Sequence, residues 1–341
     1  MDRRTFVKVA GMASVAATAG MAGCQGGGDD GSTDDSPSDG SISGGATARY
    51  NQWLYADAVE GSESFAVSLD WETASNQQSS QSTASSDESL RDDALAITPI
   101  SWLFVGALSV GFGLSQLGLN SAVEEGGPTE YVHVASGGII IEGSYDTESL
   151  ATSIEQAGAS QVEEYNGYTL YQQSGTQGTA IGLSSETVVV VQGSGENVSD
   201  PLARVKGIID AGAGERTLLS EDSESFNDVA NALPNRSVMG AAHRPEPEPL
   251  NSSSGEEGGD TGLSQTDLDG EVDAIATSAD VSQGSMTSAM AIRYTSESEV
   301  NAKADIEAAI GSQASNQSVT IDGPLVVIEG EYDALPSLSS S

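Results

Sequence analysis

The side chains that could carry out acid–base or metal chemistry are few in this sequence. Histidine occurs only at His133, between two valines of a strand pattern, and at His243, just before a proline-rich run. We expect His133 on an exposed face of a hairpin, and the spacing pairs neither histidine with a serine or a carboxylate. The motifs G-x-S-x-G and H-E-x-x-H, the P-loop and a strand-linked G-x-G-x-x-G do not occur. The acidic run 267–273 lacks the spacing of a calcium loop. We therefore predict no catalytic residue, no cofactor and no metal site.

Chemistry of a different kind is indicated at the N-terminus. A basic start that contains Arg3-Arg4 precedes a weakly apolar run at 9–22, and Gly23-Cys24 follow this run. A positive region, an apolar region and small residues in this order are typical of an export signal. The apolar run is too short to span a bilayer by itself. Cys24 is the only cysteine, so the chain can form no internal disulfide.

The paired arginines, followed by Thr5, Phe6, Val7 and Lys8, resemble a twin-arginine signal, which marks proteins exported in folded form. Residues 21–24 (Met-Ala-Gly-Cys) resemble a lipobox. The resemblance implies that Arg3 and Arg4 direct export. It also implies that a lipid on Cys24 anchors the mature chain at the extracytoplasmic face of the membrane. The alternative is an N-terminal amphipathic helix with a chance cysteine. Because one lipid chain binds a membrane only weakly, stable anchoring needs a second chain or a further contact.

Export would also make glycosylation possible. Asn-x-Ser sequons occur at Asn197, Asn235, Asn251 and Asn316. The sequon at Asn251 is predicted to be the most exposed, because it lies in a linker. A chain rich in serine and asparagine produces such sequons by chance, so each is a candidate only.

The charge of the chain indicates its solvent. The net charge is −39, from 51 acidic and 12 basic residues, and lysine is nearly absent. Self-repulsion of this size destabilises a compact state at low salt, but at about 1 M salt the Debye length is about 3 Å and most of the repulsion is screened. Acidity along the whole chain resembles that of haloarchaeal surface proteins. The alternative is a disordered acidic chain, against which the apolar runs count. Nucleic acid is not an expected partner, because no basic patch exists to meet phosphate.

Composition divides the chain into five predicted segments. These are a signal peptide at 1–23, a disordered Gly/Ser/Asp tether at 24–46, an α+β module at 47–244, an acidic Pro/Ser/Gly linker at 245–262 and a second, shorter α+β module at 263–341. Within the first module, residues 74–89 are polar and of low complexity, so we expect a loop there.

The segment 94–123 carries no charged side chain and is long enough to span a membrane. Pro99, several serines and four glycines count against a span, and a span would return the rest of an exported chain to the cytoplasm. We favour a buried helix, a membrane-surface helix or a helical hairpin. An apolar face resting on the membrane would supply a second anchoring contact.

Hydrophobic periodicity predicts the fold class. Strand patterns such as 65–71 alternate with helical patterns such as 146–158, and the order of elements predicts an α+β fold with an antiparallel sheet and helices on one face. Residues 139–146 and 326–333 match at nearly every position, counting Ile and Val as equivalent, and similar elements precede both copies. This predicts two related β-α-β-β modules, with chance recurrence of a common strand-and-turn phrase as the alternative.

These observations predict a lipid-anchored extracytoplasmic surface protein of a halophile. Because no catalytic constellation is evident, we favour a non-enzymatic binding or interaction module whose ligand is a protein or a small molecule. The alternatives are an extracytoplasmic hydrolase that uses carboxylates or a metal, and a structural component of the cell envelope.

Overall fold

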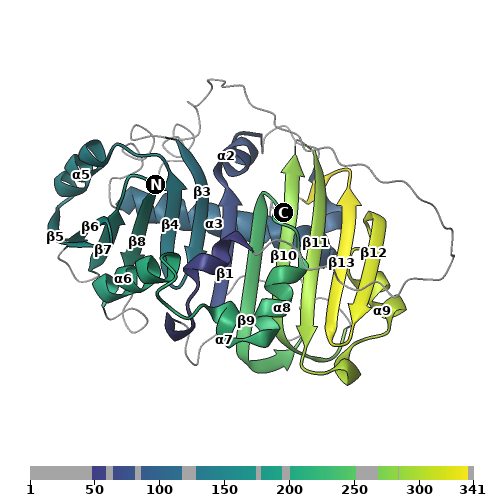
Figure 1. Ribbon diagram of the computed structural model, residues 1–341. Helices are drawn as coiled ribbons and strands as arrows, with labels where there is room; N and C mark the ends of the chain where they lie inside the picture. Colours follow the sequence, from purple (N-terminus) through teal and green to yellow (C-terminus); the bar gives the residue numbers. More distant parts are fainter. Residues whose placement is uncertain are drawn as a thin grey trace, which may run out of the picture.

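The computed structural model describes residues 48–58, 64–80, 86–116, 128–173, 178–193, 200–250, 268–282 and 284–336. These residues are arranged around one large sheet (Figure 1). The predicted signal peptide and tether, with Arg3, Arg4 and Cys24, lie outside the described residues, as do the sequons Asn197 and Asn251.

The sheet has twelve strands in the order β12-β13-β11-β10-β9-β1-β3-β4-β8-β7-β6-β5. All neighbouring strands are antiparallel, as predicted. The strands are β1 (Ser64–Asp70), β3 (Thr129–Ala135), β4 (Gly138–Gly143), β5 (Ala159–Tyr165), β6 (Tyr168–Gln173), β7 (Thr179–Leu183), β8 (Thr187–Gln192), β9 (Val238–Pro249), β10 (Glu271–Ser282), β11 (Ser285–Tyr294), β12 (Ser315–Asp322) and β13 (Leu325–Tyr332). The short strands β2 (Ser86–Asp87) and β14 (Leu335–Pro336) form a separate parallel pair.

The helices lie on both faces of this sheet (Figure 1). One side, called the front face below, carries η1 (Arg49–Trp53), α6 (Pro201–Gly212), α7 (Leu219–Asp222) and α8 (Glu224–Ala232). The opposite side, called the back face, carries α2 (Trp71–Ser80), α3 (Ala94–Gln116), α5 (Thr147–Gln156) and α9 (Lys303–Ala309). The remaining short elements are η2 (Ala56–Ala58), η3 (Glu88–Asp92) and η5 (Glu297–Glu299).

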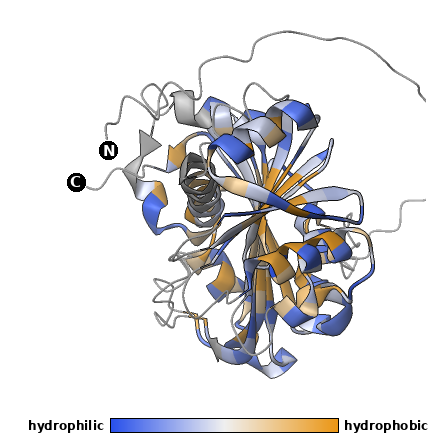
Figure 2. Ribbon diagram, turned by 90° about the vertical axis from the view of Figure 1, so that its left-hand side faces the viewer, coloured by the Kyte–Doolittle hydropathy of each residue, from blue (hydrophilic) through white to orange (hydrophobic). Residues whose placement is uncertain are grey.

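The prediction that helices cover only one face is therefore wrong, and the strand residues show why. Successive residues of a strand point to opposite faces, and here both sets are apolar. In β8, Val189 and Val191 pack in the front core, whereas Val188 and Val190 pack in a back core. A sheet that is apolar on both faces must be covered on both. Figure 2 shows hydrophobic residues concentrated along the strands of the sheet, which lies between the helices of the two faces.

Helix α3 crosses the back face from β13 to β4, so the first part of the uncharged segment 94–123 is a core helix. Small residues permit its close approach to the sheet. A Cβ added at Gly106 would lie 2.5 Å from Leu69 Cδ1, and one added at Gly240 of β9 would lie 2.6 Å from the Trp102 ring. No helix among the described residues is both long and apolar enough to cross a membrane. Residues 117–123 lie outside the described part of the chain.

Strand β9 corrects the predicted linker at its beginning. Residues 245–249 continue β9, and Glu248 and Pro249 pair with Val272 and Glu271 of β10 after a bulge. Leu250, which follows, is buried in the back core. The rest of the predicted linker, 251–262, lies outside the described residues. Because β9 and β10 are neighbours, both predicted modules contribute strands to the same sheet.

The repeated phrases fall on β4 and β13, and the elements before them do recur as a strand, helix and hairpin. The hairpins join the sheet through different strands, however. The first hairpin pairs with β1 through its first strand, β3, whereas the second pairs with β11 through its second strand, β13. The sheet therefore establishes the mixed α and β architecture but not a division into two equivalent modules.

Candidate functional site

The structure gives each of the two histidines a polar partner. His133 lies on β3, and its Nε2 is 3.2 Å from Oε2 of Glu142 on β4. The side chain of His133 is fully buried, so its predicted place on an exposed face is wrong. The cause is the segment η1, which lies over this part of the front face and brings the Trp53 ring within 6.4 Å of the imidazole.

Glu142 links this histidine to η1. Its Oε1 accepts hydrogen bonds from Trp53 Nε1 at 3.2 Å and from Gln52 Nε2 at 3.1 Å. Burial by itself raises the pKa of Glu142. The close contact with His133, the hydrogen bond from Trp53 and the charge of Arg49 outweigh burial, and the pKa is lowered. Glu142 is therefore held as a carboxylate that binds η1 to the sheet.

The first segment of the folded body also packs on glycines of α6. A Cβ at Gly212 would overlap the Trp53 ring, and one at Gly207 would lie 2.5 Å from the Tyr55 hydroxyl. Ser136 donates a hydrogen bond to the Trp53 carbonyl at 2.8 Å. Because His133 lies beneath this closely packed segment, the pair His133–Glu142 cannot meet a substrate without movement of η1. The geometry of the pair His133–Glu142 is better suited to holding η1 on the sheet than to catalysis.

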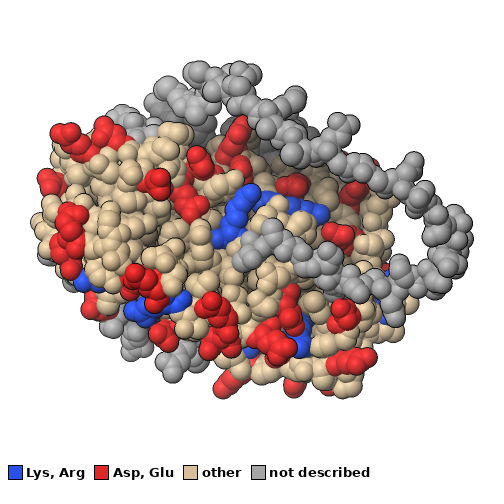
Figure 3. Space-filling view, viewed as in Figure 1, with Lys and Arg blue, Asp and Glu red and all other residues tan. Residues whose placement is uncertain are grey.

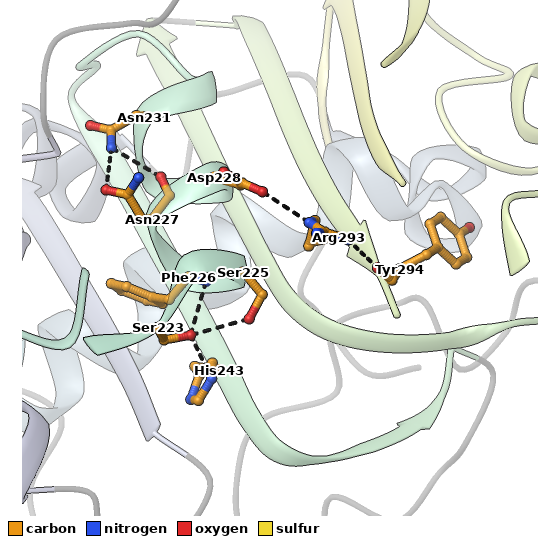
Figure 4. A network of polar contacts seen from close by, with 9 residues as sticks. All are labelled: Ser223, Ser225, Phe226, Asn227, Asp228, Asn231, His243, Arg293 and Tyr294. Carbon is orange, nitrogen blue, oxygen red and sulfur yellow. Dashed lines mark hydrogen bonds and ion pairs between the residues drawn. The ribbon is translucent and has the colours of Figure 1, made fainter. Parts of the chain in front are cut away.

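His243 has a more accessible arrangement (Figure 4). Its Nε2 lies 3.0 Å from Oγ of Ser223, the residue that caps the N-terminus of α8. The same Oγ accepts a hydrogen bond from the backbone N–H of Phe226 at 3.3 Å and lies 3.1 Å from Oγ of Ser225. Both His243 and Ser223 are half-buried.

The electrostatics of this pair favour a neutral imidazole. Burial lowers the pKa of His243, while the charges of Asp273 and Asp222 act in the opposite direction. A neutral imidazole beside a serine hydroxyl can take up its proton, which is the first requirement for a nucleophilic serine. The Ser223 oxygen is also engaged as a helix cap, a purely structural task.

Further contacts fix α8 on the sheet beside this pair. Arg293 of β11 donates from Nε to Oδ2 of Asp228 at 2.9 Å and from a terminal nitrogen to the carbonyl of Tyr294 (Figure 4). Within α8, Asn231 donates to Asn227. Ser223, at the N-cap of α8, and His243, on β9, are therefore held next to each other by the packing of α8 on the sheet. Sequence reasoning missed this pair because the two residues belong to different elements and no motif links them.

The two sequons in the described residues differ in accessibility. Asn235 is half-buried, and its Oδ1 accepts a hydrogen bond from the backbone N–H of Arg49 at 3.3 Å. Asn316 is exposed on the edge strand β12 in a left-handed conformation with φ 54°, and its Nδ2 donates to Glu331 at 2.9 Å. Asn316 is thus the more accessible acceptor of the two.

Acidic side chains are spread over the front of the molecule, with a few basic ones among them (Figure 3). Across the described ranges, no three histidine, cysteine or carboxylate side chains gather closely enough to hold a metal ion. The acidic run 267–273 is described only from residue 268 onward, where β10 begins at Glu271.

Comparisons with known proteins find only distant structural similarity. No protein-family model and no curated protein matches the chain. Among solved structures, crystal form III of TP0453 is similar at 12% identity and a TM-score of 0.43, covering 81% of this chain and 93% of the other. Crystal form I of TP0453 has 10% identity and a TM-score of 0.43, covering 84% and 93%. A similarity this distant supports no statement about function.

Proposed function

We propose that this protein is a lipid-anchored extracytoplasmic surface protein of a halophile, exported by the twin-arginine route, whose folded body binds a protein or small-molecule partner. The observation that carries the proposal is the placement of the only cysteine. Cys24 directly follows the basic and apolar regions of an export signal, and a segment rich in Gly, Ser and Asp separates it from the folded body. This arrangement suits an anchor rather than a structural thiol.

The topology supports export in the folded state. Strand β1 pairs Val67 with Gly240 of β9, so the centre of the sheet cannot form until most of the chain is present. Sheets built from such distant pairings fold slowly and expose strand edges while they do so. A route that carries folded proteins avoids this exposure outside the cell.

The lipid anchor is tested by mass spectrometry of the N-terminal peptide from membranes of the native host. We expect the mature chain to begin at Cys24 and to carry a lipid, and we expect the variant Cys24→Ser to lose this modification. A control with Arg3→Lys and Arg4→Lys should retain the full-length precursor inside the cell. An unmodified Cys24 in membrane-bound mature protein would contradict the proposal.

The proposed halophilic environment makes a separate prediction about stability. A net charge of −39 opposes compaction unless salt screens it. We expect the midpoint of urea unfolding to rise between about 0.1 M and about 2 M KCl. A midpoint that stays constant or falls over this range would argue against adaptation to high salt.

A hydrolase is the second candidate, and the observation that favours it is the contact between Ser223 and His243 at 3.0 Å. This would be a serine enzyme, rather than the carboxylate- or metal-dependent enzyme that acidity alone suggests. A fluorophosphonate probe distinguishes the candidates. Labelling that Ser223→Ala abolishes and Ser225→Ala preserves would establish a nucleophile. Absence of labelling would leave Ser223 as a helix cap and favour the binding protein or a structural envelope component.

The two-module layout also stands as a proposal. Its support is the recurrence of the phrases at 139–146 and 326–333 after similar elements. If residues 47–244 and 263–341 are separate units, native-state hydrogen exchange should show β10 to β13 opening independently of β3 to β8. A single cooperative opening would mean that the shared sheet overrides the repeat.

A further inference from the structure

The longest helix of this acidic protein has an outward face without charge. About one residue in seven of the chain is acidic, yet α3 contains no Asp, Glu, Lys or Arg over its 23 residues. A helix packed on a sheet normally turns polar residues to solvent. Ile97, Ser101 and Phe104 share the side of α3 opposite Gly106, which faces Leu69 of the sheet.

The outward face of α3 is exposed at Phe104. The helix contacts η3 and β14, and Ile100 is buried in the back core with Leu335 of β14. One turn further on, Phe104 is 48% exposed. On β1, Phe65 is 39% exposed, and its ring stacks on Trp102 of α3 with centroids 6.0 Å apart. Two of the four exposed large hydrophobic side chains of the described residues therefore belong to α3 and its immediate neighbour.

We propose that this surface, formed by Phe104 with Ile97 and Ser101 on the outward side of α3, rests in the interface of a lipid bilayer as a second attachment beside the lipid on Cys24. The inference rests on the proposed function, because the anchor is what brings the body to the membrane. Aromatic side chains favour the membrane interface. An uncharged face avoids the cost of placing carboxylates there.

The chain length between the anchor and the body permits this contact. The 24 residues at positions 24–47 span at most about 80 Å even when fully extended. A surface held within that distance of the bilayer meets it at high effective concentration, so weak binding is enough. Two weak attachments together give stable anchoring where one lipid chain does not.

The test uses the full mature chain, residues 24–341, carrying Cys24→Ser so that no lipid contributes. Sedimentation with sucrose-loaded phosphatidylcholine vesicles in about 2 M KCl, where charge effects are screened, measures binding by the body alone. We expect measurable binding that Phe104→Ser weakens about tenfold. The matched control is Val162→Ser, because Val162 is 45% exposed on the far edge strand β5. It should bind as the parent does.

Three outcomes would overturn the inference. The body could fail to sediment with vesicles, both variants could bind alike, or the parent could be a dimer that Phe104→Ser converts to a monomer, which would make the surface a protein contact. Circular dichroism of both variants checks that they are folded. If the body does not bind vesicles, the proposal of a lipid on Cys24 is unaffected. If the body binds vesicles but Cys24 carries no lipid, the proposed lipid anchor is overturned and this inference is not.

Discussion

Asp93 provides the sharpest test of how α3 is held in the fold. Its side chain is 2% exposed and lies just before the first residue of α3. Oδ1 accepts hydrogen bonds from the backbone N–H of Leu95 at 3.1 Å and of Gly311 at 2.8 Å, and Oδ2 accepts one from Gln313 at 3.0 Å. One carboxylate thus caps α3 and ties it to the turn between α9 and β12.

The variant Asp93→Ala would leave three backbone donors without their acceptor. Each buried donor left unpaired costs about 1–3 kcal/mol, and part of this is recovered because a buried carboxylate no longer has to be desolvated. We expect the free energy of unfolding to fall by about 3–4 kcal/mol. Asp93→Asn should lower the free energy of unfolding by less than Asp93→Ala does. Its side-chain oxygen can still accept hydrogen bonds from Leu95 and Gly311, and only the N–H of Gln313 would face an amide group that cannot accept.

Urea unfolding in about 2 M KCl measures the loss, with Asp146→Ala as the matched control. Asp146 caps α5 through Glu148 and Ser149 on the exposed surface, so its replacement should cost about 1 kcal/mol. If Asp93→Ala lowers the free energy of unfolding by no more than Asp146→Ala does, the cost of desolvating the buried carboxylate equals the gain from its hydrogen bonds. That result would refute the reasoning.

Three other perturbations follow from single contacts. Gly240→Val should destabilise by about 1–3 kcal/mol, because its Cβ would meet the Trp102 ring at 2.6 Å; an unchanged melting temperature would contradict the close packing of α3. The pKa of His243 is lowered by burial, so the unfolded state takes up the proton at a higher pH, and stability should fall as the pH drops below about 6.5. His243→Gln should weaken that pH dependence in parallel unfolding titrations, and an unaltered dependence would assign it elsewhere. On protein from the native host, Asn316→Gln should remove a glycan from the intact mass and Asn235→Gln should not, the reverse result counting against accessibility as the determinant.

The elements predicted best were those fixed by neighbouring residues. Helix α5 begins at the N-cap Asp146, whose side chain accepts from two backbone N–H groups. The turn between β5 and β6 is formed by Asn166 and Gly167 at φ 46° and 82°, the left-handed conformations that these residue types favour. Local chemistry of this kind can be read without knowledge of the rest of the chain.

The errors lie where distant segments decide the outcome. Residues 71–80 form α2 although most of them are polar without helical periodicity, so the predicted loop at 74–89 is wrong in its first part. It is also wrong at 86–89, where β2 and the start of η3 lie. In β9, the prolines at 245, 247 and 249 suggested a linker. Their spacing places all three ring nitrogens along one side of the strand, and β1 no longer pairs with β9 beyond His243. Because no described strand pairs with this edge of β9 beyond His243, the missing N–H groups of the three prolines break no hydrogen bond of the sheet.

The burial of His133 shows the same limit at the candidate site. Its neighbours in sequence form an ordinary alternating strand, and the partners that enclose it, Trp53 and Glu142, come from η1 and β4. A pattern of one strand cannot report which distant segment covers it. The pair Ser223–His243 was missed for the same reason, since only the packing of α8 on β9 and β10 brings the two side chains together.

Strand β1 joins the two sides of the sheet. Strands β3 to β8 lie to one side of it and β9 to β13 to the other, and α3 crosses this junction on the back face. A segment near the start of the folded body thus depends on β9, which is made much later. The sheet is not complete until the strands on both sides of β1 are present, and until β9 is made, β1 presents an open edge to other chains. This dependence gives a physical reason to fold such a protein before the proposed export, and it is why we connect the paired arginines with the architecture of the sheet as well as with the proposed lipid anchor.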